Sequence, residues 1–116
     1  MSTLPDDIGN FVELKYLDAS ANRLIAVPET IDQLTELQCV ILDFNDLTTL
    51  PESFGQLVSL KNLTIRRNSI GFLLESFGQL SALKDLRLTS NKLIMLPESF
   101  YQLQALQKFY LSMNRM

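Results

Sequence analysis

Residues 50–72 read LPESFGQLVSLKNLTIRRNSIGF, and this 23-residue pattern recurs along the whole chain. Each unit opens on Leu or Val, and Ile or Phe, then Leu, then Asn follow at fixed positions. The asparagine column is the clearest, with Asn22, Asn45, Asn68, Asn91 and Asn114 in register. The units span residues 4–26, 27–49, 50–72, 73–95 and 96–116 without insertions, which predicts a single repeat domain over residues 1–116. A period of this length indicates a solenoid in which each unit buries its apolar side against its neighbours.

The second half of each unit predicts a short strand. In the third unit the step of two residues from Leu63 to Ile65 is typical of a strand with one face turned inward. We expect parallel strands near residues 15–19, 38–42, 61–65, 84–88 and 107–111. A proline opens the return path of four units, where its fixed φ suits the first turn of a short helical segment. The predicted fold class is therefore α/β, with a curved parallel sheet on the concave face and short helical or 3-10 segments on the convex face.

Three columns carry further structural expectations. An asparagine amide both donates and accepts, so the Asn column should satisfy backbone groups where the chain turns away from the strand. Leu74 replaces the proline in the fourth unit, which predicts a looser convex turn there. Ala19 occupies a position that larger apolar residues hold in the other units, which predicts a thin first layer.

The order of the recurring residues within each unit resembles that of a known repeat family. Residues 60–70 fit L-x-x-L-x-L-x-x-N-x-L, the leucine-rich-repeat signature. The first half of the unit, as in LPDDIGNF at 4–11 and LPESFGQL at 50–57, resembles the intracellular Ras-group repeats, which include Ras-pathway scaffolds and the Scribble and Erbin class. The resemblance covers residues 4–116. It implies an intracellular module that binds proteins, often through its concave sheet, in signalling or scaffolding, and it supplies no catalytic residue.

The composition disfavours catalysis and several classes of ligand. The chain has no histidine and one cysteine, Cys39, which removes the commonest general base and the usual zinc ligands. We therefore expect no catalytic residue, metal or cofactor. A net charge of −3 argues against nucleic acid and membrane surfaces as partners. A lone cysteine and the lack of an export signal at the N-terminus favour a reducing, cytoplasmic location.

The residues between the inward leucines should form the concave surface. Ile41 and Tyr16 are apolar or aromatic groups beside the charges of Asp18 and Asp43, a combination typical of interfaces. Phe44 precedes an asparagine of the column and is expected to tuck partly into the turn. The candidate partner-binding residues are Tyr16, Asp18, Ile41, Asp43, Phe44, Thr64, Arg66, Arg87 and Tyr110.

Contacts within the sheet offer a simpler interpretation of several of these side chains. Asp43 with Arg66, and Asp85 with Lys108, stand in neighbouring strands where they are placed to pair, and Arg87 is placed to stack on Tyr110.

Two alternatives to a protein-binding module stay open. The first is an assembly piece that docks through its ends. Residues 1–58 carry a charge of −8 and residues 59–116 a charge of +5, and Phe109, Leu111 and Met116 are expected to lie exposed on the last layer. Self-association through these uncapped ends is one form of this alternative. The second is a regulatory repeat fragment of a larger enzyme.

Overall fold

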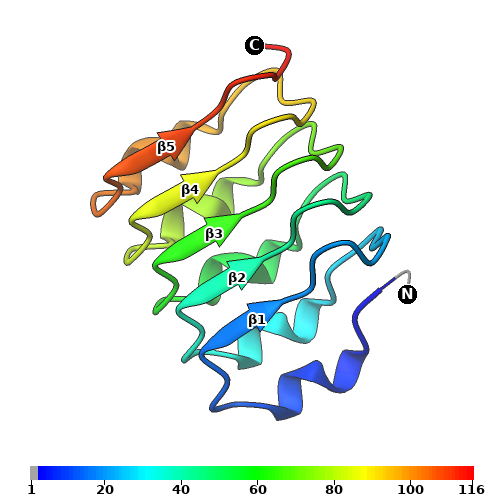
Figure 1. The fold of residues 1–116 in the computed structure, drawn as a ribbon. Helices are drawn as coiled ribbons and strands as arrows, with labels where there is room; N and C mark the ends of the chain where they lie inside the picture. The colour runs from blue at the N-terminus through cyan, green and yellow to red at the C-terminus, as the bar shows by residue number, and fades with distance from the viewer. Residues whose placement is uncertain (1–2) are drawn as a thin grey trace.

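The computed structural model describes residues 3–116, which form a stack of coils with one strand in each coil (Figure 1). The strands follow one another in the order β1-β2-β3-β4-β5, and each neighbouring pair is parallel. Each strand lies one residue inside both predicted bounds, so the leucine-rich-repeat fold expected from the sequence is confirmed. The strands are β1 (Tyr16–Asp18), β2 (Cys39–Ile41), β3 (Asn62–Thr64), β4 (Asp85–Arg87) and β5 (Lys108–Tyr110).

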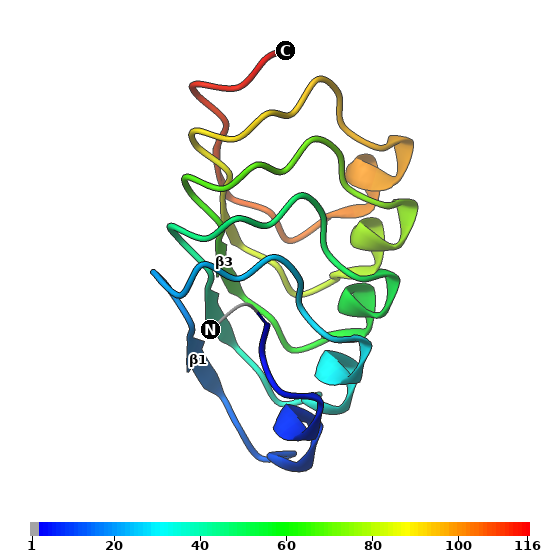
Figure 2. The same cartoon turned by 90° about the vertical axis from the view of Figure 1, so that its right-hand side faces the viewer.

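Short 3-10 helices line the side of the coils opposite the sheet (Figure 2). Pro5, Pro28, Pro51 and Pro97 each stand directly before such a helix, with φ between −65° and −69°. A proline ring fixes φ in this range, so these residues favour the bend that begins each helix. The helices are η1 (Asp6–Asn10), η2 (Glu29–Gln33), η3 (Glu52–Gln56), η4 (Glu75–Gln79) and η5 (Glu98–Gln102).

Leu74 adopts the same backbone conformation as the prolines. Its φ of −72° and ψ of 158° match the −68° and 153° of Pro97, and η4 has the same length as the other helices. The looser fourth turn predicted from the missing proline was therefore wrong. An extended conformation with φ near −70° is open to leucine as well, and the stacking of η4 between its neighbours selects it.

The core is complete in the middle units and thinner in the outer ones. Leu37, Leu60 and Leu83 share one column and are fully buried, whereas Leu14 and Leu106 of the same column are only partly buried. Ala19 is itself buried, and Leu17 beside it stays half-exposed, in line with the expected thin first layer. Each inward leucine thus depends on a unit on both sides for full burial, as expected of a solenoid.

The asparagine column forms the predicted ladder of side-chain hydrogen bonds. The Oδ1 atom of Asn45 accepts the backbone N–H groups of Asn22 and Leu24 at 3.0 and 2.9 Å. Its Nδ2 atom donates to the carbonyl oxygens of Ala19 and Leu42 at 3.1 and 3.0 Å. These backbone groups belong to the turn after the strand, so the side chain supplies partners that the sheet does not.

Candidate functional site

The candidate residues form continuous rows across the sheet. Parallel pairing places Asp18, Ile41, Thr64, Arg87 and Tyr110 side by side, one from each strand. A second row contains Tyr16 of β1 and runs through Cys39, Asn62, Asp85 and Lys108. Since side chains one residue apart in a strand point to opposite faces, these two rows occupy the same exposed face of the sheet.

A shallow hollow lies at the centre of this face, and we call it the central hollow. Its volume of about 190 Å³ is below the roughly 300–1,000 Å³ typical of small-molecule sites, so it fits individual side chains of a larger ligand better than a whole small molecule. Cys39, Asn62 and Asp85 line it although the sequence did not single them out as binding residues. The lining comprises Cys39, Ile41, Asn62, Leu63, Thr64, Arg66, Asp85 and Arg87.

Arg66 is held in place by the carboxylate of Asp43. Asp43 is only 4% exposed, and it accepts the Oγ1–H of Thr64 and the backbone N–H of Arg66, both at 2.7 Å. Its Oδ2 atom accepts Nε–H and Nη2–H of the Arg66 guanidinium at 3.1 and 2.9 Å. The predicted pairing of Asp43 with Arg66 is thus present. Because Asp43 is buried, Arg66 is the member of the pair that a partner can touch.

Arg87 is fixed on the next strand by two neighbours. Its Nε–H and Nη2–H donate to the carboxylate of Asp85 at 3.1 and 3.3 Å, and this carboxylate raises the pKa of Arg87. The guanidinium carbon lies 4.9 Å from the ring centre of Tyr110, which confirms the predicted stacking. A pairing of Asp85 with Lys108 was predicted and is wrong. Asp85 and Arg87 are two residues apart on one strand, so they share a face, and the guanidinium fork takes both carboxylate oxygens.

The chain places Phe44 on the surface rather than in the turn. Phe44 is 54% exposed and has a φ of 58°, so the expectation that it tucks into the turn was wrong. Positive φ recurs at this position in every unit, and the left-handed conformation turns the side chain outward. The sequence gives no warning, because glycine, the residue that most often marks this conformation, is absent from the column. The column is Ala21, Phe44, Arg67, Ser90 and Met113.

The first strand contributes a carboxylate and an aromatic ring to the concave face. Asp18 accepts the Oγ–H of Ser20 at 2.6 Å and the Ser20 backbone N–H at 3.0 Å, and these bonds lower the pKa of Asp18. Burial raises the pKa of the neighbouring Cys39 thiol, and the charge of Asp18 raises it further. Tyr16 is 57% exposed beside them. This end of the face is therefore anionic and aromatic, with a protonated thiol at neutral pH.

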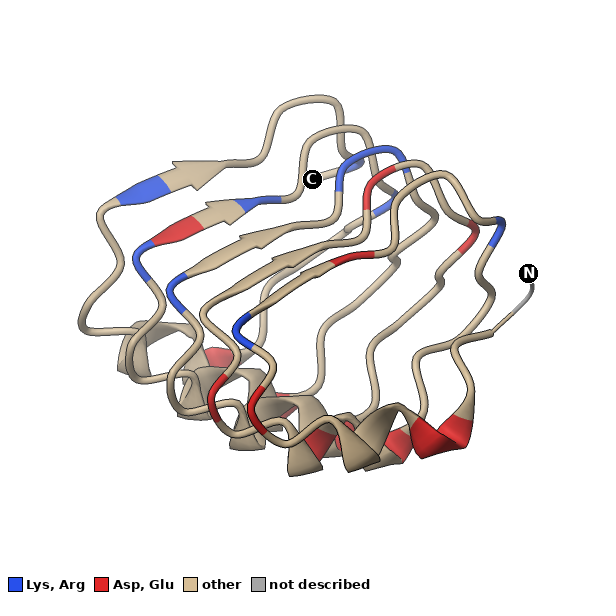
Figure 3. Ribbon diagram, turned by 60° about the horizontal axis from the view of Figure 1, so that its bottom comes forward, with Lys and Arg blue, Asp and Glu red and all other residues tan. Residues whose placement is uncertain are grey.

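Charge is divided between the two faces as well as between the two halves of the chain (Figure 3). Within residues 3–116 the 3-10 helices carry seven acidic residues and no Lys or Arg, a charge of −7. The other six acids and all ten basic residues lie outside the helices and sum to +4. The sequence predicted only the contrast between the halves. In the folded chain the convex face repels anions, and the cations of residues 59–116 gather on the strands and on the loops that flank them.

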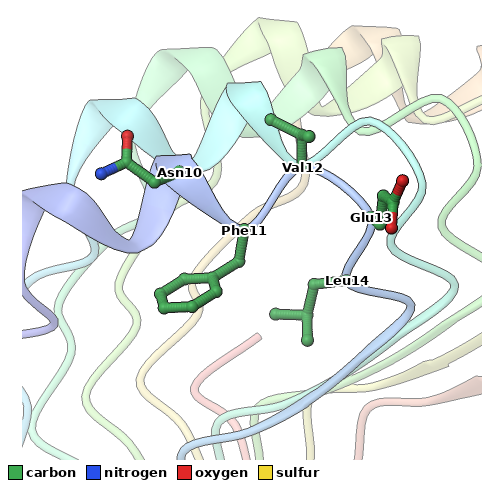
Figure 4. A pocket seen from close by; sticks show the side chains of 5 residues that line it. All are labelled: Asn10, Phe11, Val12, Glu13 and Leu14. Atoms are coloured by element: carbon green, nitrogen blue, oxygen red, sulfur yellow. The ribbon is translucent and has the colours of Figure 1, made fainter.

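A further hollow opens at the N-terminal end of the stack, lined by residues 10–14 (Figure 4). Leu14 extends toward Phe11, whereas Val12 points away from them (Figure 4). Phe11 and Val12 are 58% and 52% exposed. At the opposite end Met116 is exposed as expected, but the expectation for Phe109 and Leu111 was wrong, since both pack against the core and are half-buried. The ring of Phe109 lies 4.9 Å from that of Phe100. Apolar surface is therefore present at both ends of the stack.

No group of three or more His, Cys, Asp or Glu side chains in residues 3–116 is placed to hold a metal ion. Over the same residues, no helix has the length and apolar character needed to cross a membrane.

Comparison with known proteins relates the chain to one repeat family. The profile described as "Leucine rich repeat" matches residues 74–116. A leucine-rich-repeat protein of Leptospira interrogans is 33% identical with a TM-score of 0.84, over 98% of this chain and 35% of that one. TLR13, solved in complex with ssRNA13, is 28% identical with a TM-score of 0.87, over 98% of this chain and 17% of that one. The plant peptide hormone receptor RGFR1, solved in complex with RGF2, is 25% identical with a TM-score of 0.66, over 97% of this chain and 22% of that one.

These three structures are much longer than this chain, which spans about a third of the Leptospira protein and less of the other two. No match was found among curated protein sequences.

Proposed function

We propose that this chain, a leucine-rich-repeat protein, binds another protein on the concave face of its sheet and performs no catalysis of its own. The observation that carries the proposal is the row Asp18–Ile41–Thr64–Arg87–Tyr110 on the open face of the sheet, whose middle three residues line the central hollow. It combines an aliphatic and an aromatic anchor with charged groups, which is the composition of energetically important interface residues.

The fixed positions of two arginine side chains on the concave face support this proposal. The side chains of Arg66 and Arg87 are 46% and 42% exposed, yet Asp43 and Asp85 hold their guanidinium groups in place. Long side chains that are already fixed lose less conformational entropy when a partner binds. The two arginines therefore present donors to a partner at a low entropic cost.

The kind of ligand follows from charge rather than from the fold. The related structures show this repeat with an RNA in the TLR13 complex and with RGF2 in the RGFR1 complex, so the fold admits different ligands. A net charge of −3, with −7 on the convex helices, favours a protein over nucleic acid for this chain. A signalling or scaffolding role of the Ras-group kind and a cytoplasmic location are part of the proposal. The LPxxIG half-repeat and the single Cys39 support them.

A second candidate function is assembly through the ends of the stack. The exposed Phe11 and Val12 at one end and Met116 at the other favour it. Static light scattering over a range of concentrations tests it: growth of the mass with concentration supports assembly, and a constant monomer mass up to ~100 μM, where μM-affinity contacts would be populated, contradicts it.

Photo-crosslinking tests the concave assignment. A photoreactive amino acid in place of Ile41 lies in the central hollow. One in place of the exposed Val58 lies in the turn between η3 and β3. We expect a protein partner from the native cell extract to crosslink from position 41 and not from position 58. Equal crosslinking from both positions, or crosslinking from position 58 alone, would overturn the assignment.

A further inference from the structure

We propose that another hollow, at the edge of the sheet, binds the carboxylate of an acidic side chain from the partner. This edge pocket rests on the proposed function, since it extends the concave site past the ends of the strands. It has a volume of about 360 Å³, enough for one or two side chains. Its lining is Phe44, Arg66, Arg67, Thr89, Ser90 and Met113.

The backbone beneath the edge pocket is fixed. The N–H of Phe44 donates to the carbonyl of Arg66 at 2.9 Å, and the N–H of Arg67 donates to the carbonyl of Thr89 at 3.0 Å. The ladder of parallel pairing therefore continues beyond the strands. Phe44, Arg67, Ser90 and Met113 all have positive φ, and the N–H groups of the first three are bonded to the next coil, so this edge is preorganised. Because the N–H groups of Phe44, Arg66, Arg67 and Ser90 are already bonded, side chains supply most of the donors for a ligand here.

Arg67 supplies the unneutralised charge of the edge pocket. Its guanidinium carbon lies 5.5 Å from the ring centre of Phe44, which keeps the group over the pocket. The ion pairs within residues 3–116 are Asp43–Arg66 and Asp85–Arg87, so no carboxylate of these residues neutralises Arg67. A guanidinium offers a planar fork of donors that matches a carboxylate.

The remaining walls suit a carboxylate on an alkyl stem. Thr89 and Ser90 contribute hydroxyl groups, which can donate to an oxygen that only accepts. Phe44 and Met113 are 54% and 76% exposed, so their apolar surfaces can cover the methylene groups of a glutamate or an adjacent apolar residue. Arg66 lines both the edge pocket and the central hollow, so one extended segment can occupy both.

The charges favour an acidic protein segment over a nucleic acid. Tight binding of a nucleic acid needs several cations that neutralise successive phosphates. Here Arg66 and Arg87 already face carboxylates, and Asp18 adds a negative charge at the far end of the row. One free guanidinium beside two partly neutralised ones fits isolated carboxylates.

Three fluorescent probes test this inference on the full chain: an octapeptide of alternating Glu and Phe, its Gln–Phe counterpart, and a single-stranded oligouridylate. We expect the Glu peptide to bind at least about tenfold more tightly than the Gln peptide. Arg67→Gln should reduce that preference to less than about twofold, and Arg67→Lys should restore part of it because the charge returns. Lys92→Gln is the matched control, since exposed Lys92 lies outside the edge pocket and should leave the preference unchanged.

Equal binding of the Glu and Gln peptides, binding of neither, or tighter binding of the oligouridylate would each overturn the edge-pocket assignment. So would a loss of preference in Lys92→Gln as large as in Arg67→Gln. Circular dichroism of each variant verifies that the fold is kept. The proposed function is judged separately, because crosslinking from position 41 does not depend on Arg67.

Discussion

One buried carboxylate, that of Asp43, sets the position of Arg66 on the neighbouring coil. It accepts the backbone N–H of Arg66 at 2.7 Å and binds the guanidinium through Nε and Nη2. The same carboxylate accepts the hydroxyl of Thr64. Asp43 therefore joins two units of the stack and orients the cation that the central hollow and the edge pocket share.

Replacing Asp43 should cost more stability than replacing Arg66. Asp43→Ala removes every one of these bonds and leaves the Arg66 N–H without its acceptor, so we expect a loss of about 2–4 kcal/mol in the free energy of unfolding. Arg66→Ala keeps the Thr64 and backbone bonds and should cost at least about 1 kcal/mol less. Urea denaturation of both variants measures the difference, and equal losses would contradict this role of Asp43.

The asparagine ladder predicts an effect that depends on position. Asn45→Ala leaves buried backbone groups of the first two turns unpaired, and we expect a loss of about 2–4 kcal/mol. Asn22→Ala is the control, because Asn22 is only partly buried and, within residues 3–116, its side chain donates to Ala19 and Ser20 alone. Asn22→Ala should lower the free energy of unfolding by about half as much as Asn45→Ala. Thermal unfolding of the two variants tests this order of stability losses. A larger loss from Asn22→Ala than from Asn45→Ala would contradict it.

Replacing glycine by alanine should have opposite effects on stability at two positions. A Cβ atom at Gly55 would collide with the backbone carbonyl of Ser76, whereas one at Gly71 would meet nothing within 4 Å. Gly55→Ala should therefore force η3 and η4 apart and cost about 1–3 kcal/mol. Gly71→Ala should be neutral or stabilise by up to about 1 kcal/mol, because it restricts the unfolded chain. Chemical denaturation measures both, and similar values would argue against the close stacking of the helices.

The thiol of Cys39 should react slowly near neutral pH. Burial first, and then the charge of Asp18, raise its pKa, so a smaller fraction is thiolate at a given pH than in an exposed cysteine. The rate of alkylation by iodoacetamide should thus rise at a higher pH than in a free cysteine peptide. Asp18→Asn should lower the pH midpoint of the alkylation rate only partly, because burial of the thiol remains. Asp46→Asn should leave this midpoint unchanged. A midpoint equal to that of the peptide would contradict this environment.

The repeat explains why so much of the fold could be predicted from the sequence. Strand positions and the Asn ladder follow from local spacing, because each coil packs against a near-copy of itself. Leu74 shows the limit of residue-by-residue interpretation, since the stacked neighbours impose a conformation that the missing proline had left open.

The side-chain contacts of the candidate surface were harder to predict, because they depend on the choice between near-equivalent partners. Asp85 stands beside Lys108 in the register, yet it bonds Arg87 on its own strand, which reaches both of its oxygens. The edge pocket needs the positive φ of Phe44 and Arg67, and neither residue type signals that conformation. The charge on the convex face becomes visible only once the 3-10 helices are placed.

The affinity of Ile41→Glu for the partner found by crosslinking, measured beside that of Val58→Glu, tests the central claim most directly. Both changes put a carboxylate in place of an aliphatic side chain, one in the central hollow and one in the turn before β3. We expect Ile41→Glu to weaken binding by more than about tenfold, roughly 1.4 kcal/mol, and Val58→Glu to leave it within about twofold. Equal losses from the two variants, or a loss from Val58→Glu alone, would contradict a binding site on the concave face.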